Sequence, residues 1–271
     1  MRVKNSSNVC ESWKIYHVNI RGFQSKVTSF ENIVQSLKPS VITFNETQLK
    51  NKNGVKLKGY TSFSTNRVNK DGGGVATSVV NSERAHFLKV FESEKDNDLI
   101  ITRHGQFQVP INIINIYGQV ESRSTKDQTS ERWNDILEQV SKIEAKGEFV
   151  ILIGDFNAHL GSLEGNKKKT YGGKLIDEFL ETGNYELINA SSKSVGGPYT
   201  RYDPSDKYSD SKKSILDLCI VSKQLSKHVE TLFIDKDMLF TPYRVVGSKD
   251  LIYTDHYALI LTLTGLPVTG S

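Results

Sequence analysis

The sequence has few cysteines and no long apolar run. Cys10 and Cys219 lie far apart in the chain of 271 residues, which excludes a disulfide scaffold and a zinc site built on cysteines. The first dozen residues are polar, without the apolar segment of a secretory signal. No later run approaches the roughly 20 residues of a transmembrane helix. We therefore expect a soluble protein with no membrane partner, from a reducing compartment.

The sequence also lacks a strong charge bias, internal repeats and low-complexity linkers. Lysine and arginine number 35 against 31 aspartates and glutamates, an excess compatible with a polyanionic partner but too small to identify one. We expect a single domain over residues 12–264. Residues 1–11 are then an N-terminal extension, and residues 265–271 are a tail or the start of a linker.

Short apolar runs rich in valine and isoleucine predict buried strands. They cover residues 13–18, 41–44, 75–80, 111–117, 149–153, 215–221 and 257–263. Helical spacing of apolar residues predicts helices at 28–37, 133–143 and 175–180, the first begun by a Thr28–Glu31 capping box. Residues 60–116 contain mostly strands and turns. An α/β fold, a four-layered sandwich of two packed β-sheets flanked by helices, accounts for both patterns.

The strand predicted at 149–153 ends abruptly in Gly154-Asp155-Phe156-Asn157. Asp155 and Asn157 are two residues apart, so in an extended segment their side chains leave the same face. One interpretation is an Asx-turn that caps the strand. The other is a carboxylate and a carboxamide kept there for chemistry, since polar groups beside a buried strand are costly without a partner or a task. These residues alone favour neither.

Polar residues also stand at the ends of other predicted strands, where sites form in α/β proteins. They are Asn19, Arg21, Glu46, Tyr117, Thr254, Asp255 and His256, whereas Asp217 lies inside the strand that starts at Ser214. Most could singly be turn caps or rim residues, but Asp217 lies between two leucines in a buried run and needs a partner such as a histidine. Carboxylates converging with one histidine would form an oxygen-rich site suited to Mg²⁺ or Mn²⁺.

In order along the chain, six motifs resemble those of the endonuclease/exonuclease/phosphatase superfamily, which has the DNase I-like fold. They are His17-Val18-Asn19-Ile20-Arg21-Gly22, Phe44-Asn45-Glu46-Thr47-Gln48-Leu49, Asn115-Ile116-Tyr117-Gly118, Gly154-Asp155-Phe156-Asn157, Ser214-Ile215-Leu216-Asp217 and Thr254-Asp255-His256. The resemblance runs from about Trp13 to Leu263. Within the superfamily, the forms of the fourth and sixth motifs are most similar to the apurinic-type endonuclease domain of non-LTR (LINE-type) retrotransposons.

The resemblance implies metal-assisted hydrolysis of a phosphodiester. Glu46 with Asn19 would hold the Mg²⁺ or Mn²⁺, and Asp255 would lie beside the metal.

The resemblance also assigns the remaining catalytic roles. Asp155 would orient or deprotonate the attacking water, and Asn157 and Tyr117 would donate hydrogen bonds to the phosphate. His256, positioned by Asp217, would contact the scissile phosphate.

Double-stranded DNA is the partner that the resemblance implies. Residues 200–214 match a variable hairpin that probes the minor groove. The expected DNA contacts are Thr200, Arg201, Ser214 and Thr254, with the lysines Lys167, Lys168, Lys169, Lys212 and Lys213. A solvated charged surface is the alternative for the lysines.

The sequence departs from the repair-type members at two positions. Arg21 stands where many of them carry an acid that assists the metal, and Arg201 replaces a bulky aromatic residue, which favours nicking of intact DNA over abasic sites. We expect a product with a 3′-hydroxyl and a 5′-phosphate, made in the nucleus by one module of a longer polyprotein with a reverse transcriptase. The alternatives are a phosphoesterase acting on abasic DNA, RNA, phospholipid or inositol phosphate, and a catalytically silent DNA-binding remnant.

Overall fold

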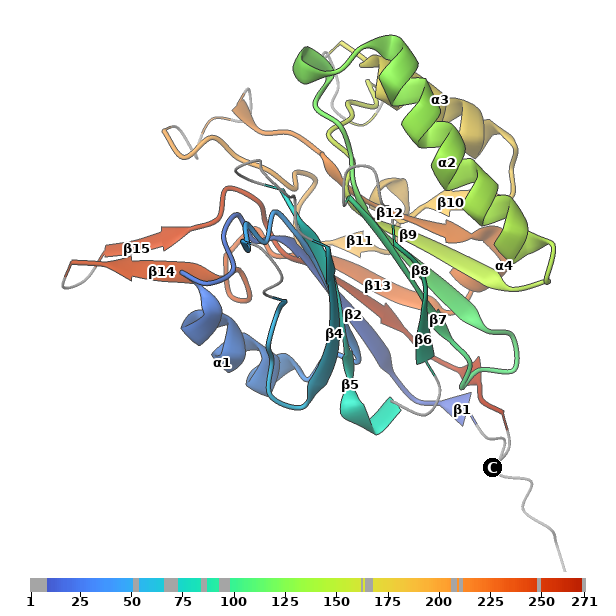
Figure 1. The fold of residues 1–271 in the computed structure, drawn as a ribbon, viewed down its shortest axis with the longest axis horizontal. Helices are drawn as coiled ribbons and strands as arrows, with labels where there is room; N and C mark the ends of the chain where they lie inside the picture. Colours follow the sequence, from blue (N-terminus) through green and yellow to red (C-terminus); the bar gives the residue numbers. More distant parts are fainter. Residues whose placement is uncertain are drawn as a thin grey trace, which may run out of the picture.

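Two β-sheets lie face to face at the centre of the protein (Figure 1). The structure is a computed structural model. It describes residues 9–50, 54–65, 73–83, 87–92 (backbone only), 98–161, 163, 168–205, 209, 212–247 and 250–269.

The larger sheet has seven strands and the smaller has six. The larger runs, from edge to edge, β11 (Ser194–Val195), β13 (Val229–Ile234), β16 (Leu259–Leu263), β2 (Trp13–Asn19), β3 (Val41–Asn45), β5 (Val75–Val80) and β4 (Tyr60–Thr65). The smaller runs β10 (Tyr185–Leu187), β12 (Asp217–Ser222), β9 (Phe149–Asp155), β8 (Ile111–Tyr117), β7 (Leu99–His104) and β6 (Phe87–Glu92).

The central strands are apolar on both faces because both faces are covered. Ile15 of β2 and Ile151 of β9 belong to the cluster between the sheets, whereas the next residues along, Tyr16 and Leu152, belong to clusters on the outer faces. This alternation explains why the sequence shows continuous apolar runs rather than a period of two.

Helices cover the outer face of each sheet (Figure 1). Helix α1 (Val27–Leu37) packs Phe30 and Ile33 against the seven-stranded sheet. Helices α2 (Lys126–Glu144) and α3 (Tyr171–Glu181) pack apolar residues such as Trp133 and Ile176 against the six-stranded sheet. The short segments are α4 (Lys223–Ser226) and the 3₁₀ turns Asn81–Glu83, Glu121–Arg123 and Ile188–Ala190. The predicted four-layered α/β sandwich is confirmed.

One predicted helix start is wrong. Helix α1 begins at Val27 after Lys26, with no side-chain cap, because Thr28 already lies in its first turn. Helix α2 begins well before its apolar stripe, at a capping box formed by Thr125 and Gln128.

The predicted tail contains part of the fold. Strand β17 (Leu266–Pro267) pairs with β1 (Val9–Cys10), and the Leu266 side chain is buried in the cluster between the sheets. Burial of this leucine stabilises the contact between residues 265–269 and the body of the fold.

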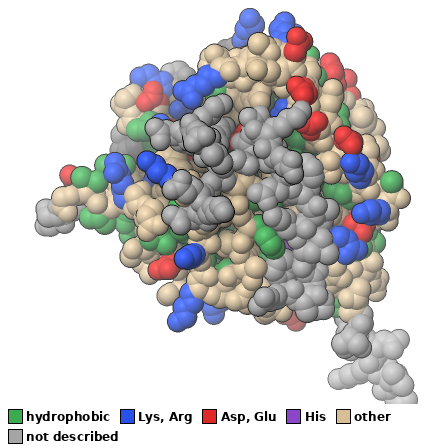
Figure 2. Space-filling view, in the orientation of Figure 1, with side chains coloured by type: hydrophobic (Ala, Val, Ile, Leu, Met, Phe, Trp, Pro, Cys, Tyr) green, Lys and Arg blue, Asp and Glu red, His purple; other side chains and the backbone are tan. Residues whose placement is uncertain are grey.

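A second two-stranded ribbon, β14 (Tyr243–Val246) with β15 (Asp250–Tyr253), protrudes from the body. Figure 2 shows hydrophobic side chains gathered on it, and Val245, Val246, Leu251 and Ile252 are exposed. Among the described residues, no helix is long and apolar enough to span a bilayer.

Candidate active site

Six segments bring their polar residues to one end of the two sheets. The parallel pairs β2–β3 and β8–β9 end at this edge. Strand β12 runs antiparallel to β9 and starts here, with Asp217 opposite Asp155. Asp217 is therefore the first residue of its strand, not an interior one as predicted. A cavity of about 500 Å³ opens at this end, lined among others by Arg21, Glu46, Tyr117, Asp155, Asn157, His159, Arg201, Asp255 and His256.

Asp155 makes the turn that the local sequence allows and also faces the cavity. Its Oδ1 accepts a hydrogen bond from the Asn157 amide at 2.9 Å, which is an Asx-turn. Asn157 is left-handed, with φ 47°, so the extended geometry assumed from the sequence ends at Asp155. The Asn157 carboxamide donates to the Gly118 carbonyl at 2.9 Å. One carboxylate oxygen of Asp155 thus holds the turn, and the other is available to the site.

Glycine is required immediately before Asp155. A Cβ on Gly154 would lie 1.9 Å from the Ile116 carbonyl oxygen, and a Cβ on Gly118 would lie 2.0 Å from the Phe156 carbonyl oxygen. The backbones of the two strand ends therefore approach more closely than any side chain permits, which brings Asp155 beside Tyr117.

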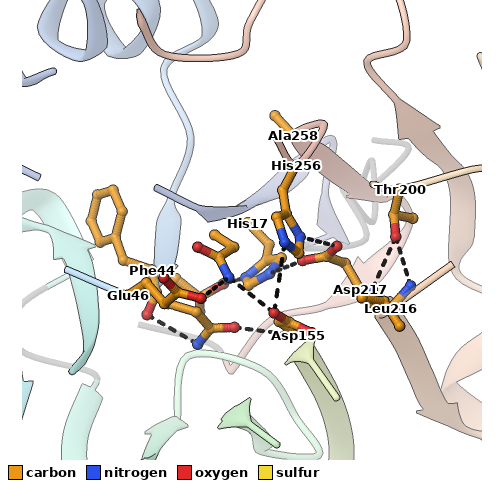
Figure 3. Close-up of polar contacts among 12 residues, drawn as sticks. His17, Phe44, Glu46, Asp155, Thr200, Leu216, Asp217, His256 and Ala258 are labelled. Carbon is orange, nitrogen blue, oxygen red and sulfur yellow. Dashed lines mark hydrogen bonds and ion pairs between the residues drawn. The ribbon is translucent and has the colours of Figure 1, made fainter. Parts of the chain in front are cut away.

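His256 is held by Asp217 and faces Asp155 (Figure 3). Its Nδ1 lies 2.7 Å from Asp217 Oδ2, and its Nε2 lies 3.9 Å from Asp155 Oδ2. Asp217 is fully buried. The hydroxyl of Thr200 accepts hydrogen bonds from the amides of Leu216 and Asp217 at 2.9 and 3.0 Å, which fixes the start of β12.

Burial and mutual charge set the ionisation of these groups. Burial raises the pKa of Asp155 to about 7, against the opposing positive charge of His256. Burial would lower the pKa of His256, but the charge and hydrogen bond of Asp217 outweigh it and raise the pKa to about 9. Asp217 is also buried, yet its two histidine neighbours hold its pKa at about 2. At neutral pH, His256 is therefore protonated and Asp217 ionised.

Asn19 joins two carboxylates from different strands. Its Nδ2 donates to Glu46 Oε1 at 3.0 Å and to Asp155 Oδ2 at 2.9 Å. The Tyr117 hydroxyl donates to the same Glu46 oxygen at 2.9 Å. Since both acceptors are carboxylates, the donating atom must be the amide nitrogen, and the Asn19 oxygen is left buried with no partner among the described residues.

Asp255 is paired with two arginines. Its Oδ2 lies 2.8 Å from Arg21 Nη1 and 3.2 Å from the Nε and Nη2 atoms of Arg201. Burial opposes ionisation of Asp255, but His256 and the arginines lower its pKa. Its Oδ1, like the Asn19 oxygen, is buried without a partner in the described part of the chain.

The donor atoms fit a hard divalent cation. The unpartnered oxygens of Asn19 and Asp255, with the Glu46 carboxylate, are the oxygen ligands that Mg²⁺ and Mn²⁺ prefer. Asp155, Asp217 and His256 form a second group whose ligand atoms lie within 4.8 Å of one another, although Asp217 and His256 are already bonded together.

Three of the residues expected to contact DNA are instead interior. Thr200 is 0% exposed, Thr254 1% and Ser214 5%. The Thr200 hydroxyl supports β12, and the Thr254 hydroxyl donates to the Asn19 carbonyl at 2.7 Å. These hydroxyls serve the backbone of the site. Arg201 differs, because its side chain is 40% exposed and lines the cavity.

The expected lysine contacts are dispersed. Lys168 and Lys212 are exposed, and Lys169 forms an ion pair with Asp177. The Lys213 ammonium lies 5.9 Å from the centre of the Tyr199 ring. Lys167 lies outside the described residues.

Buried amides that the sequence analysis did not select lie directly beneath Asp155. Asn45 accepts a hydrogen bond from the Asp155 amide at 2.7 Å and donates to Asn115 at 3.0 Å, and Asn115 donates to the Ala76 carbonyl at 2.8 Å. His17, also not selected, contacts Asp217. The sequence pattern that could have identified them is a polar residue two positions from another in a predicted strand, as in His17 with Asn19. Such residues lie on the same face of the strand.

Residues 17–256 match the Endonuclease/Exonuclease/phosphatase family. The chain belongs to this family. It is therefore a hydrolytic enzyme of the nuclease and phosphoesterase type, and the resemblance found in the sequence is confirmed. Family members typically depend on a divalent metal, in agreement with the buried acidic and histidine groups.

Solved structures of several nucleases have the same fold. The endonuclease domain of TRAS1, a telomere-specific non-LTR retrotransposon, matches with a TM-score of 0.64 and 13% identity over 93% of this chain and 98% of that one. An AP endonuclease from Archaeoglobus fulgidus matches at 0.70 and 16%, over 93% and 99%. The Xenopus laevis APE2 catalytic domain matches at 0.71 and 15%, over 95% and 94%. No curated protein matches the sequence.

Proposed function

We propose that this chain is a divalent-metal-dependent endonuclease that nicks double-stranded DNA and leaves a 3′-hydroxyl and a 5′-phosphate. The observation that carries the proposal is the pairing of a base and an acid at one cavity. Asp155 has a pKa near neutrality, and His256, 3.9 Å away, is protonated at neutral pH. Hydrolysis of a phosphodiester needs both.

Each residue has a task in that reaction. The Asp155 carboxylate accepts a proton from the attacking water. Protonated His256, oriented by Asp217, donates a hydrogen bond to a phosphate oxygen as negative charge develops there. The carboxamide of Asn157 lines the same cavity and has a second N–H, besides the one given to Gly118, that can donate to the phosphate. Tyr117 also lines the cavity, but its hydroxyl hydrogen is given to Glu46.

A metal ion would be held by Glu46, the Asn19 oxygen and Asp255. When bound, Mg²⁺ or Mn²⁺ supplies positive charge that stabilises the phosphate and its leaving oxygen. Glu46 is prepared for this task because Asn19 and Tyr117 both donate to its Oε1 and fix the carboxylate.

Intact duplex DNA is the substrate favoured by the cavity. Arg21 and Arg201 line it and are 55% and 40% exposed, so their positive charges can attract the phosphates of a DNA backbone. By analogy with the retrotransposon endonuclease domain that shares the fold, we propose that the chain acts on chromosomal DNA in the nucleus. In the same analogy it belongs to a longer polyprotein with a reverse transcriptase, which extends the new 3′-hydroxyl.

A second candidate is processing of DNA ends. A Neisseria protein of the same fold is described as a 3′-5′ exonuclease in one structure and as a 3′ phosphatase in another, with TM-scores of 0.68 and 0.66. The same acid and base would serve a terminal phosphate equally well.

Supercoiled plasmid distinguishes these functions. Incubation with Mg²⁺ or Mn²⁺ should convert it to relaxed circles, and Asp155→Ala and His256→Ala should each lower the rate by at least about 100-fold. Asp127→Ala, an exposed aspartate at the start of α2, is the matched control.

The outcome decides between the candidates. Relaxed circles that DNA ligase reseals support the endonuclease. Failure to relax the plasmid with any divalent metal rejects it, and release of phosphate from a 3′-phosphorylated duplex by the same preparation would favour end processing.

A further inference from the structure

His17 is a fully buried histidine of the seven-stranded sheet. It contacts the active-site residue Asp217, which belongs to the six-stranded sheet. His17 belongs to β2, on the face that carries Asn19 two residues later. Its Nε2 lies 3.3 Å from Asp217 Oδ1 (Figure 3). Its Nδ1 lies 2.9 Å from Thr43 Oγ1 on the neighbouring strand β3. His17 has no role in the hydrolysis proposed for this site.

The partners of His17 fix its proton and its orientation. The ionised Asp217 carboxylate only accepts hydrogen bonds, so Nε2 carries the hydrogen that faces it. Nδ1 lies within hydrogen-bond distance of the Thr43 hydroxyl, a group that can either donate or accept, and this hydroxyl also reaches the Tyr16 carbonyl at 3.5 Å. Both ring nitrogens are satisfied in this arrangement, and a ring flip would lose both contacts.

Asp217 is consequently held at both carboxylate oxygens. His256 takes Oδ2 at 2.7 Å and His17 takes Oδ1 at 3.3 Å, while the Thr200 hydroxyl accepts from the Asp217 amide. Rotation of the carboxylate would break its bond to His17 and leave a buried oxygen unpaired, which is strongly unfavourable. Removal of His17 therefore frees the group that orients His256.

We propose that His17 is a positioning residue for catalysis, which acts through Asp217 to hold the imidazole of His256 toward the phosphate. The inference rests on the proposed hydrolytic function. His17 lies opposite Leu259 of β16 and Thr43 of β3 in the seven-stranded sheet, whereas Asp217 begins β12 of the six-stranded sheet. The contact thus joins the two sheets next to the catalytic groups.

Two substitutions separate the hydrogen bond from the volume of the ring. His17→Leu keeps a side chain of similar volume and removes both polar contacts. In the plasmid-nicking assay it should lower kcat about 10- to 100-fold, with KM changed less than about threefold. His17→Gln retains a donor and an acceptor, and should stay within about threefold of wild type.

Two further variants guard against a purely structural explanation. His104→Leu removes another fully buried histidine that contacts a threonine hydroxyl, Thr102 Oγ1 at 3.1 Å, and should leave kcat within about threefold. Thr43→Val keeps the shape of the side chain and removes the hydroxyl that contacts Nδ1, so it should lower kcat about 3- to 10-fold even if His17→Leu does not fold.

A spectroscopic readout tests the inference without activity. In protein with ¹⁵N-labelled histidine, the downfield proton on His256 Nδ1 reports its bond to Asp217. We expect its resonance to shift in His17→Leu and Thr43→Val and to stay in place in His104→Leu. The proposal would be overturned if the resonance were unchanged in both His17→Leu and Thr43→Val. It would also be overturned if these two variants lost no more kcat than His104→Leu. If the wild type hydrolyses no DNA, the proposed function fails, and the resonance still decides whether His17 positions His256.

Discussion

His256 Nε2 and Asp155 Oδ2 lie 3.9 Å apart, close enough to attract each other but beyond a normal hydrogen bond. At this distance a protonated histidine and a carboxylate lie side by side at the cavity without a direct hydrogen bond between them. Each has a different partner on its far side, Asp217 for His256 and the Asn157 amide for Asp155.

This pair predicts a bell-shaped pH dependence for kcat/KM. Asp155 must be ionised to accept a proton, so activity should fall as pH drops through its pKa of about 7. His256 must be protonated to donate, so activity should fall as pH rises through about 9. His256→Gln should remove the upper limb and retain the lower one. Rates measured from pH 5.5 to 10, at saturating metal, test this, and an upper limb that survives His256→Gln contradicts the assignment.

Arg21 should weaken metal binding because its guanidinium occupies Asp255 Oδ2 at 2.8 Å. Arg21→Ala removes this competing positive charge. We expect Mg²⁺ to bind about 3- to 10-fold more tightly, a modest gain because the arginine is 55% exposed and partly screened by solvent. Calorimetric titration measures the affinity. Arg244→Ala, exposed on the β14 ribbon, is the control, and equal affinities in both variants would show that Arg21 does not compete.

The buried amides beneath Asp155 should make a large contribution to stability. Asn45→Ala leaves the Asp155 amide and the Asn115 oxygen without their hydrogen bonds. The free energy of unfolding should fall by about 2–4 kcal/mol, as expected when buried polar groups lose a partner. Urea denaturation provides the value. Asn134→Ala on the exposed face of α2 should change stability by less than about 0.5 kcal/mol, and an equally small loss for Asn45→Ala would contradict the prediction.

Gly154 should not tolerate a side chain. Gly154→Ala places its Cβ 1.9 Å from the Ile116 carbonyl oxygen, so the backbone of β9 must shift and Asp155 with it. We expect destabilisation of more than about 3 kcal/mol, with a loss of activity. Gly147 also has a positive φ, 68°, but open space around it, so Gly147→Ala should cost only about 1 kcal/mol. Thermal unfolding of both variants tests whether the close approach, rather than glycine itself, is required.

The sequence predicted the parts of the site that depend on local patterns. The apolar run ending at Gly154 indicated where β9 stops. The Asx-turn was also predictable, because it joins two residues that are only two positions apart in the sequence. The Thr28–Glu31 capping box failed because that pattern also fits the interior of a first turn. Thr200 was expected at the DNA, yet its hydroxyl is needed by the backbone of β12, which residue type alone does not reveal.

The contacts between sheets could not be predicted in the same way. His17 and Asp217 are 200 residues apart, and nothing in either local pattern names the other. Asn45 and Asn115 likewise meet only after the sheets pack. The polar character of Asp217 inside an apolar run predicted that it needs a partner, but which residue is the partner depends on the topology.

The position of β16 between β13 and β2 has a consequence for biosynthesis. The first long strand of the chain, β2, lacks one of its two neighbours until Leu259–Leu263 has left the ribosome, and His256 arrives in the same segment. A nascent chain therefore carries Glu46, Asp155 and Asp217 before His256 is made. The active site and the larger sheet are therefore completed by the same segment of the chain.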